Sequence, residues 1–264
     1  MKLSPKITVI TPSYNQGKFL KRTIQSVVSQ KYPNLEYLIY DGGSTDNSVK
    51  IIERYAKKYP QVIKWRSKKD NGQVDAINRG LKAASGELIG YLNSDDYYLP
   101  GTLRKVVKEF AHHPRHFWLT GFYKVQFDNQ RPGRNLVSTY VHFWILFYSR
   151  PLLLVLNMIP QPSTFWRKKA LNKVGLFNRK YKFAFDYDYW LKLAKHGPPI
   201  IVRSYLSVFR KHSTSKSANF FKEQFDEQFK IARRNAANWL LLTLHLLHTH
   251  IFTIPIYTLS RHLR

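Results

Sequence analysis

The sequence predicts an α/β fold in which a mostly parallel sheet is flanked by helices. The first 112 residues alternate short apolar strands with helices, joined by short connections. The second half adds further strand-like and helical segments and ends in an apolar, basic stretch. Strands alternating with helices of this length favour right-handed βαβ units with helices on both faces of the sheet. At 264 residues, the chain is long enough for one large domain or a domain with a smaller appendage.

Four strands and four helices are expected in the first half. Short apolar runs indicate the strands, and apolar residues at three- and four-residue spacing indicate the helices. The strands are predicted at 7–10, 36–41, 62–65 and 87–92. The helices are predicted at 19–30, from Asp46 onward, at 74–84, and through Leu103 and Phe110.

The second half is expected to complete the sheet and then become helical. We predict a strand at 117–127, a loop at 128–133, helices at 168–174 and 186–196, and a closing strand at 200–209. The stretch 136–159 is very apolar and is interrupted at Arg150-Pro151. From Phe220 onward the sequence has helical character.

The charge balance is strongly basic. Lysine and arginine number 43 against 16 acidic residues, a formal charge of +27. This excess favours polyanionic partners such as nucleic acid, an anionic membrane surface or phosphorylated substrates. The absence of cysteine excludes disulfides and thiolate metal sites and fits a reducing compartment. Met1 and Lys2 lead directly into the first strand, so we expect no signal peptide.

Polar segments follow all four strands of the first half. They are 11–16 (TPSYNQ), 41–46 (DGGSTD), 70–73 (DNGQ) and 93–96 (NSDD). Because the carboxyl ends of parallel strands meet at one edge, we expect these loops to converge on one cleft. Asp95 and Asp96 would form an oxygen site there for Mg²⁺ or Mn²⁺, which can bridge to a diphosphate. The alternative for this pair is a solvated acidic turn.

Two of the loops also have more than one interpretation. Asp41 ends a buried strand, where its carboxylate can accept hydrogen bonds from a nucleobase or a ribose; the alternative is a turn in which Thr45 or Asp46 caps the next helix. Gly72-Gln73 allows close backbone approach to a ligand, or forms an ordinary turn. The chain has neither a Walker phosphate loop nor a Rossmann glycine fingerprint, so a metal and basic side chains would have to hold a diphosphate.

Two long segments resemble the N-terminal signature and the central block of family 2 glycosyltransferases, inverting GT-A enzymes that use nucleotide-activated sugars. They are ITPSYNQGKFLKRTIQSVVSQKYPNLEYLIYDGGSTDNS and DNGQVDAINRGLKAASGELIGYLNSDDYYLP. The resemblance covers 5–110 and resumes at 161–165, 185–191 and 209–212. It implies a GT-A catalytic domain over 1–215, with a nucleotide-binding half at 1–112 and an acceptor half at 113–215. A helical extension over 216–264 would follow.

The resemblance also implies roles for individual residues. In the nucleotide and donor pocket it places Thr11, Pro12, Tyr14, Asn15, Asp41, Asp70, Gln73, Asp75, Asn93 and Asp95. Asp41 would contact the base, most often uracil in this family. Asp96, Asp95 and His212 would hold Mn²⁺ or Mg²⁺. Asn93 stands where the family often has Asp, so it keeps an oxygen ligand but loses a charge. Gln161, Asp188, Trp190 and Arg210 would contact the acceptor or the diphosphate.

Asp186 matches the position of the family's catalytic base. An inverting transfer needs one carboxylate to deprotonate the acceptor hydroxyl as that hydroxyl attacks the anomeric carbon opposite the leaving diphosphate. The alternative role is helix capping, which the macrodipole favours. Asp186 is preferred to Asp188 as the base because Asp188 falls inside the predicted helix.

The C-terminal stretch 235–260 is long enough to span a bilayer, which takes ~20 apolar residues. His245, His248, His250 and Pro255 disfavour a span, so we expect an interfacial helix or a helix pair packed on the catalytic domain. The stripe of Phe221, Phe225 and Phe229 fits either core packing or membrane docking. The charge favours a peripheral enzyme on the cytoplasmic face of an anionic membrane.

These observations lead to one main functional hypothesis and two alternatives. The main hypothesis is a metal-dependent inverting transferase, of the hexosyl or N-acetylhexosaminyl class. It would move a sugar from a UDP-sugar to a hydroxyl of a glycan or lipid-linked acceptor in cell-surface polysaccharide or glycolipid synthesis. One alternative, motivated by Asn93, is a catalytically silent nucleotide-sugar-binding or scaffold protein. The other, a nucleic-acid-binding protein, is disfavoured because the chain has no RNA-recognition signature and no basic stripe.

Overall fold

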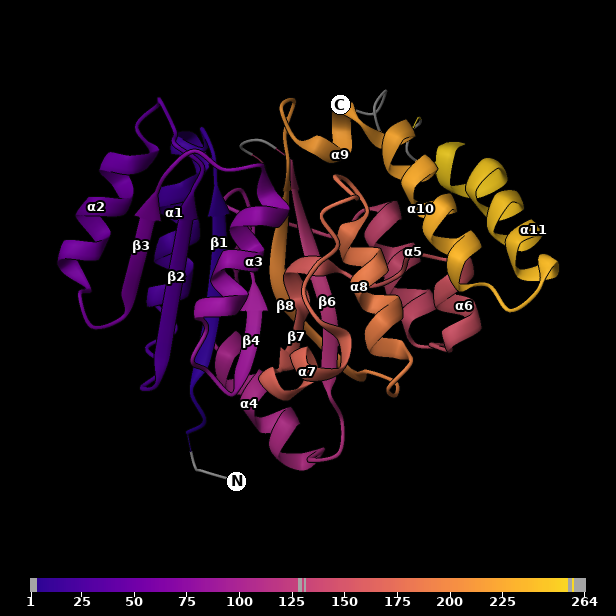
Figure 1. Cartoon of the computed structure of the whole chain (residues 1–264), viewed down its shortest axis with the longest axis horizontal. Coiled ribbons are helices and arrows are strands. Elements are labelled where there is room, and N and C mark those ends of the chain that lie inside the picture. Colours follow the sequence, from indigo (N-terminus) through magenta and orange to yellow (C-terminus); the bar gives the residue numbers. More distant parts are fainter. Residues whose placement is uncertain (1–3, 128–129, 131, 256–257, 259–264) are drawn as a thin grey trace.

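One eight-stranded sheet organises the chain. The computed structural model describes residues 4–127, 130, 132–255 and 258, so the first residues, part of the predicted loop 128–133 and the end of the extension lie outside it. The strand order is β3-β2-β1-β4-β7-β6-β8-β5 (Figure 1). The strands are β1 (Ile7–Ser13), β2 (Leu35–Asp41), β3 (Ile63–Ser67), β4 (Leu88–Tyr91), β5 (Tyr97–Tyr98), β6 (Trp118–Phe127), β7 (Thr164–Arg167) and β8 (Ile200–Lys211).

The first four strands are parallel, as the alternating pattern predicts. β1 lies between β2 and β4, with Ile7 opposite both Leu35 and Leu88, and β2 pairs with β3. All four therefore point the same way, and their carboxyl ends share one edge of the sheet (Figure 1). This edge receives the polar segments singled out in the sequence.

The other half of the sheet mixes directions. β7 runs antiparallel to both β4 and β6, and it joins the two halves. β6 and β8 are parallel, and the short β5 pairs antiparallel with β8. The strands predicted at 117–127 and 200–209 are confirmed, whereas β5 and β7 are additions to the prediction.

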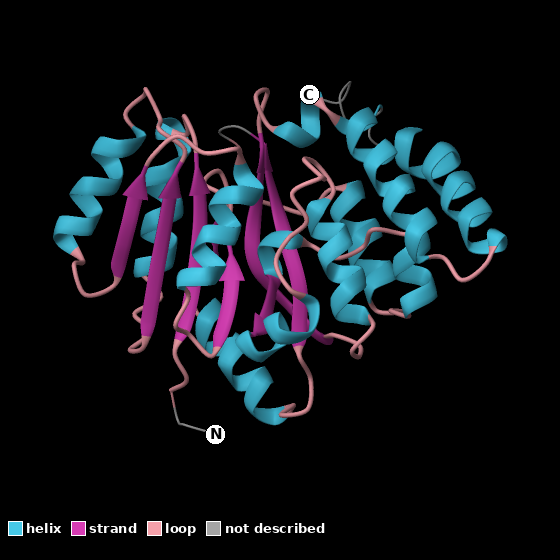
Figure 2. Cartoon of the chain, viewed as in Figure 1, coloured by secondary structure: helices cyan, strands magenta, loops and turns pink. Residues whose placement is uncertain are grey.

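Helices cover both faces of the sheet (Figure 2). Because side chains alternate along a strand, each face has its own apolar core. Ile7 and Val9 pack with α1 and α4 on one face, and Ile10 packs with α3 and α8 on the other. The helices are α1 (Gly17–Val28), α2 (Ser48–Lys58), α3 (Gln73–Ala83), α4 (Thr102–His112), α5 (Leu136–Ile145), α6 (Arg150–Val155), α7 (Leu171–Val174), α8 (Phe185–Ala194), α9 (Lys216–Asn219), α10 (Phe221–Asn235) and α11 (Trp239–His248).

The described part of the C-terminal extension packs against the domain. α10 lies beside α8, and α11 contacts α6 and α10 (Figure 1). The buried His245 on α11 hydrogen-bonds through Nδ1 to the carbonyl oxygen of Leu154, 2.9 Å away. Among the described residues, no helix has both the length and the apolar character needed to cross a bilayer.

Candidate active site

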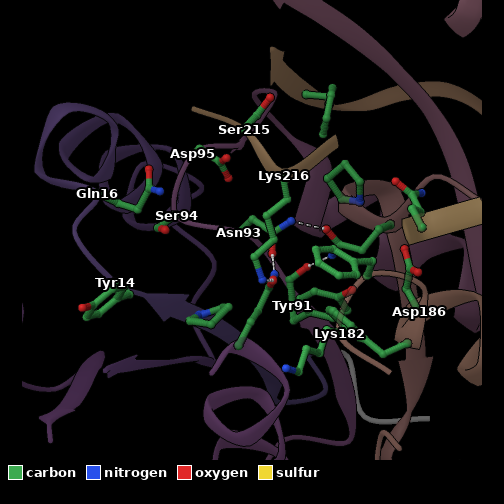
Figure 3. Close-up of a pocket in the computed structure, with 18 of the residues that line it drawn as sticks. Tyr14, Gln16, Tyr91, Asn93, Ser94, Asp95, Lys182, Asp186, Ser215 and Lys216 are labelled. Carbon is green, nitrogen blue, oxygen red and sulfur yellow. Dashed lines mark hydrogen bonds between the residues drawn. The ribbon is translucent and has the colours of Figure 1, made fainter. Parts of the chain in front are cut away.

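A cavity of about 730 Å³ opens at the carboxyl ends of β1 to β4 (Figure 3). Each polar segment predicted to converge there contributes to its wall. From these segments the lining residues are Pro12, Ser13, Tyr14, Gln16, Gly42, Gly43, Asp70, Gly72, Gln73, Asn93, Ser94 and Asp95. Gln161, Asp186 and Lys216 complete the lining, and Asp186 lies on the far side of the cavity from Tyr14 (Figure 3). The volume lies in the range of small-molecule and cofactor sites.

A chain of hydrogen bonds crosses the floor of the cavity. Lys216 Nζ donates to Gln73 Oε1 over 2.8 Å, and Gln73 Nε2 donates to Asn93 Oδ1 over 2.7 Å. Asn93 Nδ2 donates in turn to Gln161 Oε1 over 3.0 Å, and Gln161 Nε2 donates to the Tyr91 carbonyl over 2.7 Å. Asn93 thus uses its amide as both acceptor and donor, which a carboxylate at this position could not do.

The adjacent carboxylates after β4 have different surroundings. Asp95 lines the cavity, and its Oδ2 lies 3.2 Å from His212 Nε2. Asp96 is fully buried, and its Oδ1 accepts a hydrogen bond from the backbone N–H of Arg210 over 2.9 Å. The Arg210 side chain lies behind them, donating to the carbonyls of Asp95 and Phe19. Arg210 therefore holds the acidic turn and does not line the cavity.

These groups have the chemistry of a divalent metal site. Asp96 Oδ2 is buried without a hydrogen-bond partner, and burial together with the charge of Asp95 raises the pKa of Asp96 well above its usual value. Carboxylate oxygen and imidazole nitrogen both suit Mn²⁺, so Asp95, His212 and the open oxygen of Asp96 fit such an ion in kind. Within the described ranges, no three acidic or histidine side chains are grouped closely enough to enclose a metal by themselves.

Asp186 lies in the first turn of α8 and faces the cavity (Figure 3). Desolvation by the surrounding protein raises the pKa of its carboxyl to about 6, and the charge of Glu227 contributes to that rise. Its Oδ1 accepts a hydrogen bond from the backbone N–H of Tyr187 over 2.8 Å. The carboxylate can therefore exchange a proton near neutral pH, as a general base requires.

The predicted nucleotide residues divide into two groups. Pro12, Tyr14 and Asp70 line the cavity, and Tyr14 is 60% exposed. Thr11 is instead buried and accepts a hydrogen bond from the Tyr37 hydroxyl over 3.0 Å. Asn15 connects two loops, because its Oδ1 accepts from the backbone N–H of Thr45 over 2.9 Å.

Asp41 holds the loop after β2 through hydrogen bonds to its side chain. Its Oδ2 accepts from the backbone N–H groups of Gly43 and Ser44, and from the Ser67 hydroxyl over 2.7 Å. The Ser44 hydroxyl donates to Oδ1 over 2.5 Å. Only 2% of Asp41 is exposed, and its carboxylate shapes this wall; its contact with a nucleobase stays a prediction.

Three other predicted residues lie outside the cavity wall. Asp75 is buried in ion pairs with Arg79 and Arg179, at 2.8 Å and 2.6 Å. Asp188 points away from Asp186 and pairs with Lys192 over 2.7 Å. Trp190 is fully buried, with its ring stacked on that of Trp118.

Lysines at the cavity are the functional candidates that the sequence did not single out. Lys69, Lys182, Lys211 and Lys216 all line it. They come from two loops, from the end of β8 and from the start of α9, and they have no spacing signature among the 43 basic residues. In a chain this basic, a lysine that faces a site can be recognised only from the fold.

Comparison with known sequences identifies the family. Residues 8–175 match the family described as Glycosyl transferase family 2. The chain belongs to this family. It is 31% identical over 198 residues to a chondroitin synthase of Escherichia coli, covering 75% of this chain but 28% of that protein. An uncharacterized glycosyltransferase of Haemophilus influenzae is 26% identical over 249 residues, covering 91% of this chain and 76% of the relative. The match covers about a third or less of the length of the first two curated relatives, the chondroitin synthase and an uncharacterized glycosyltransferase of Nostoc.

Solved structures of glycosyltransferases share the fold. Staphylococcus aureus TarS 1-349 in complex with UDP-GlcNAc superposes with a TM-score of 0.67 at 21% identity, covering 94% of this chain and 73% of that one. The mannosyltransferase PcManGT from Pyrobaculum calidifontis, in complex with GDP-Man and Mn²⁺, gives 0.68 at 18% identity, covering 96% and 76%. The predicted GT-A fold is confirmed.

Proposed function

We propose that this family 2 glycosyltransferase transfers a sugar with inversion from a nucleoside-diphosphate sugar to an acceptor hydroxyl, with Asp186 as the base. The observation that carries the proposal is the position of Asp186, across one cavity from the strand-end loops and with a pKa of about 6. A base on the wall opposite the donor loops can remove the acceptor proton as the hydroxyl attacks from the face away from the diphosphate. Donor binding belongs to 1–112 in this proposal, and acceptor binding to 113–215.

The donor is proposed to be a UDP-sugar of the hexosyl or N-acetylhexosaminyl class. Its nucleotide would lie along the loops containing Pro12, Tyr14 and Asp70, with its diphosphate toward Asp95 and Lys216. Asp95, Asp96 and His212 would hold Mn²⁺ or Mg²⁺, which when bound offsets the negative charge of the diphosphate. The chain's own lysine at 216 adds positive charge at the same side, which favours departure of the diphosphate.

The acceptor is proposed to be a glycan or a lipid-linked sugar. The cavity lining also includes the apolar residues Val137, Val141 and Met158, beside the polar Asn157 and Gln224. These three residues also line a second cavity of about 90 Å³ that reaches Trp144 and Phe225. The apolar side chains that the two cavities share suit an acceptor with an apolar carrier.

We also propose that the face formed by α5 and α11 docks on an anionic membrane, which would make the protein a peripheral enzyme of the cytoplasmic face. These helices, the turn after α5 and the π-helical segment Thr249–Thr253 after α11 expose Leu136, Phe143, Leu146, Phe147, Trp239, Leu240, Leu244, Leu246, Leu247, Ile251 and Phe252. No acidic residue occurs between Asp128 and Asp186 or after Glu227, so this apolar surface lies on segments whose charged residues are all basic. That combination favours anionic lipid headgroups. Cosedimentation with anionic but not neutral vesicles tests it; recovery in the supernatant with both would contradict it.

The test of the enzymatic proposal is release of nucleoside diphosphate from a panel of nucleotide sugars, with Mn²⁺, with Mg²⁺ and with a chelator. Metal-dependent release from one donor supports both the class and the cofactor. Release that is unchanged by the chelator would contradict the metal proposal alone. Donor binding without transfer to any glycan or lipid acceptor, in a protein with an intact Asp186, would favour a silent nucleotide-sugar-binding role.

A further inference from the structure

The carboxylate of Glu227 on α10 reaches the chain segment just before the proposed base. Its Oε2 accepts hydrogen bonds from the backbone N–H groups of Phe183 and Ala184, over 2.8 Å and 2.9 Å. Both of its oxygens accept from the backbone N–H of Lys182, at 2.9 Å and 3.1 Å. Three consecutive backbone groups are thus bound by one side chain from the C-terminal extension.

These backbone groups have no local partner. The first N–H groups of a helix lie beyond its own hydrogen-bond ladder and are usually satisfied by a capping side chain. Ala184, at the N-cap of α8, makes no side-chain cap bond. Glu227 does not replace that cap but, from another helix, accepts from Ala184 and from the two residues before it, and its negative charge is favourable at the positive end of α8.

The segment that Glu227 binds forms part of the active-site wall. Lys182 and Phe183 line the cavity, and Asp186 follows Ala184 by two residues (Figure 3). α10 is itself fixed, because Ile231 and Ala232 are buried in the core that includes α8. The position of Asp186 therefore depends on a helix that begins only after the last strand of the sheet.

We propose that Glu227 is a positioning residue that holds the start of α8 and keeps Asp186 aimed into the cavity. The inference rests on the proposed role of Asp186 as the base. It makes the described part of the C-terminal extension a functional part of the active site, in addition to any contact with a membrane. Glu227 acts through the backbone and does not need to touch either substrate.

The electrostatic surroundings of Asp186 give this role a measurable signature. Glu227 of α10 and Tyr91 of β4 interact electrostatically with it, and Lys182 and Lys216, the latter on α9, line the same cavity. On α8 itself, Asp188 is paired with Lys192. α6 packs on α8 with apolar residues, and Lys173 of α7 lies over the Phe117 ring. Of these groups, Glu227 raises the pKa of Asp186, so its removal should lower that pKa.

The experiment compares Glu227→Ala and Glu227→Gln with the control Glu223→Ala, an exposed position one turn earlier on the same helix. Transfer is measured in the full chain at saturating donor and acceptor. Misplacing a base by about 1 Å costs up to ~100-fold, so Glu227→Ala should lower kcat ~10- to 100-fold while donor affinity changes less than ~3-fold. Glu227→Gln keeps one acceptor oxygen but no charge, so it should lower kcat less and still move the acidic limb of the pH profile to lower pH.

Amide hydrogen exchange at 182–184 gives a readout that is independent of catalysis. Exchange should accelerate in Glu227→Ala and remain as in the wild type in Glu223→Ala. Wild-type kcat and an unshifted pH limb in both Glu227 variants would overturn the proposal, as would unchanged exchange. A wild-type protein that transfers no sugar would instead refute the proposed function, and the exchange result would still decide whether Glu227 holds this segment. If Glu227→Ala does not fold, Glu227→Gln decides by its pH limb.

Discussion

The proposed base predicts that the activity of the enzyme, plotted against pH, falls on the acidic side with a midpoint near pH 6; we call this fall the acidic limb. With a pKa of about 6, the Asp186 carboxyl is ionised in about 90% of molecules at pH 7 and about 10% at pH 5. Only the ionised form can accept the acceptor's proton. Activity should therefore fall about tenfold between pH 7 and pH 5. With the ordinary value of 3.8, the same interval would change activity by less than about 10%.

The assay is kcat/KM for the donor, measured by nucleoside-diphosphate release between pH 4.5 and pH 8. This parameter reports the ionisation of groups in the enzyme before the donor binds, which is the state described here. Asp186→Asn should lower transfer ~100- to 10,000-fold and leave donor affinity unchanged. Asp188→Asn is the matched control, since this neighbour on α8 is paired with Lys192. It should keep the limb near pH 6.

Two results would refute the assignment. The first is a flat profile between pH 5 and pH 7 in a protein whose circular dichroism shows that it remains folded. The second is a folded Asp186→Asn variant with wild-type turnover. If Asp188→Asn abolishes the limb and Asp186→Asn does not, the base would be Asp188, and α8 would have to rotate to present it.

Three further predictions concern the acidic turn and the sheet. Asp95→Asn and His212→Ala should each weaken Mn²⁺-dependent donor binding ~10- to 100-fold in calorimetry, and binding that stays metal-responsive at wild-type affinity would exclude them as ligands. Burial opposes ionisation of Glu36, but hydrogen bonds from Ser85 and Thr8 outweigh it and lower its pKa from 4.5 to about 2. The ionised Glu36 therefore stabilises the fold above pH ~4.5, and this stabilisation is lost as the pH falls through about 2. The loss should lower the free energy of unfolding by about 3 kcal/mol in urea titrations. In Glu36→Gln this dependence of the unfolding free energy on pH should be absent. Gly90→Ala would bring a Cβ within 2.6 Å of the Phe165 ring, and it should cost about 1–3 kcal/mol in the same titrations; an unchanged midpoint would contradict the packing of β4 on β7.

Local sequence patterns predicted the first half of the fold because each of its elements has its own pattern of apolar residues. Each strand from β1 to β4 carries an apolar run, and the polar segments at their ends can be read one at a time. β7 could not be found in this way. Its pairing joins residues 88–90 to 165–167, and no local pattern in Thr164–Arg167 indicates that it inserts antiparallel between β4 and β6.

The prediction that Asp41 contacts a nucleobase stays a prediction, because a position at a strand end does not fix the partners of a carboxylate. Its position at the edge of the sheet was predicted correctly, and so was the possibility of a turn at Gly42-Gly43. Spacing cannot tell which side of the loop the carboxylate occupies. The structure has both of its oxygens bonded to the loop and to Ser67, so Asp41 shapes the wall that Tyr14 and Asp70 line.

The two interpretations of the apolar C-terminal region apply to different helices. On α10, Phe225 is buried and Phe229 packs near His245 of α11, so this stripe serves core packing. On α11, most of the large apolar side chains remain exposed although the helix is fixed at His245. Hydropathy could not separate the two, because it records how apolar a helix is and not which neighbours cover it. The division has a functional consequence. Through Glu227, α10 binds the backbone just before Asp186, and α11 offers the apolar face, so a membrane contact at α11 would lie one helix away from Glu227.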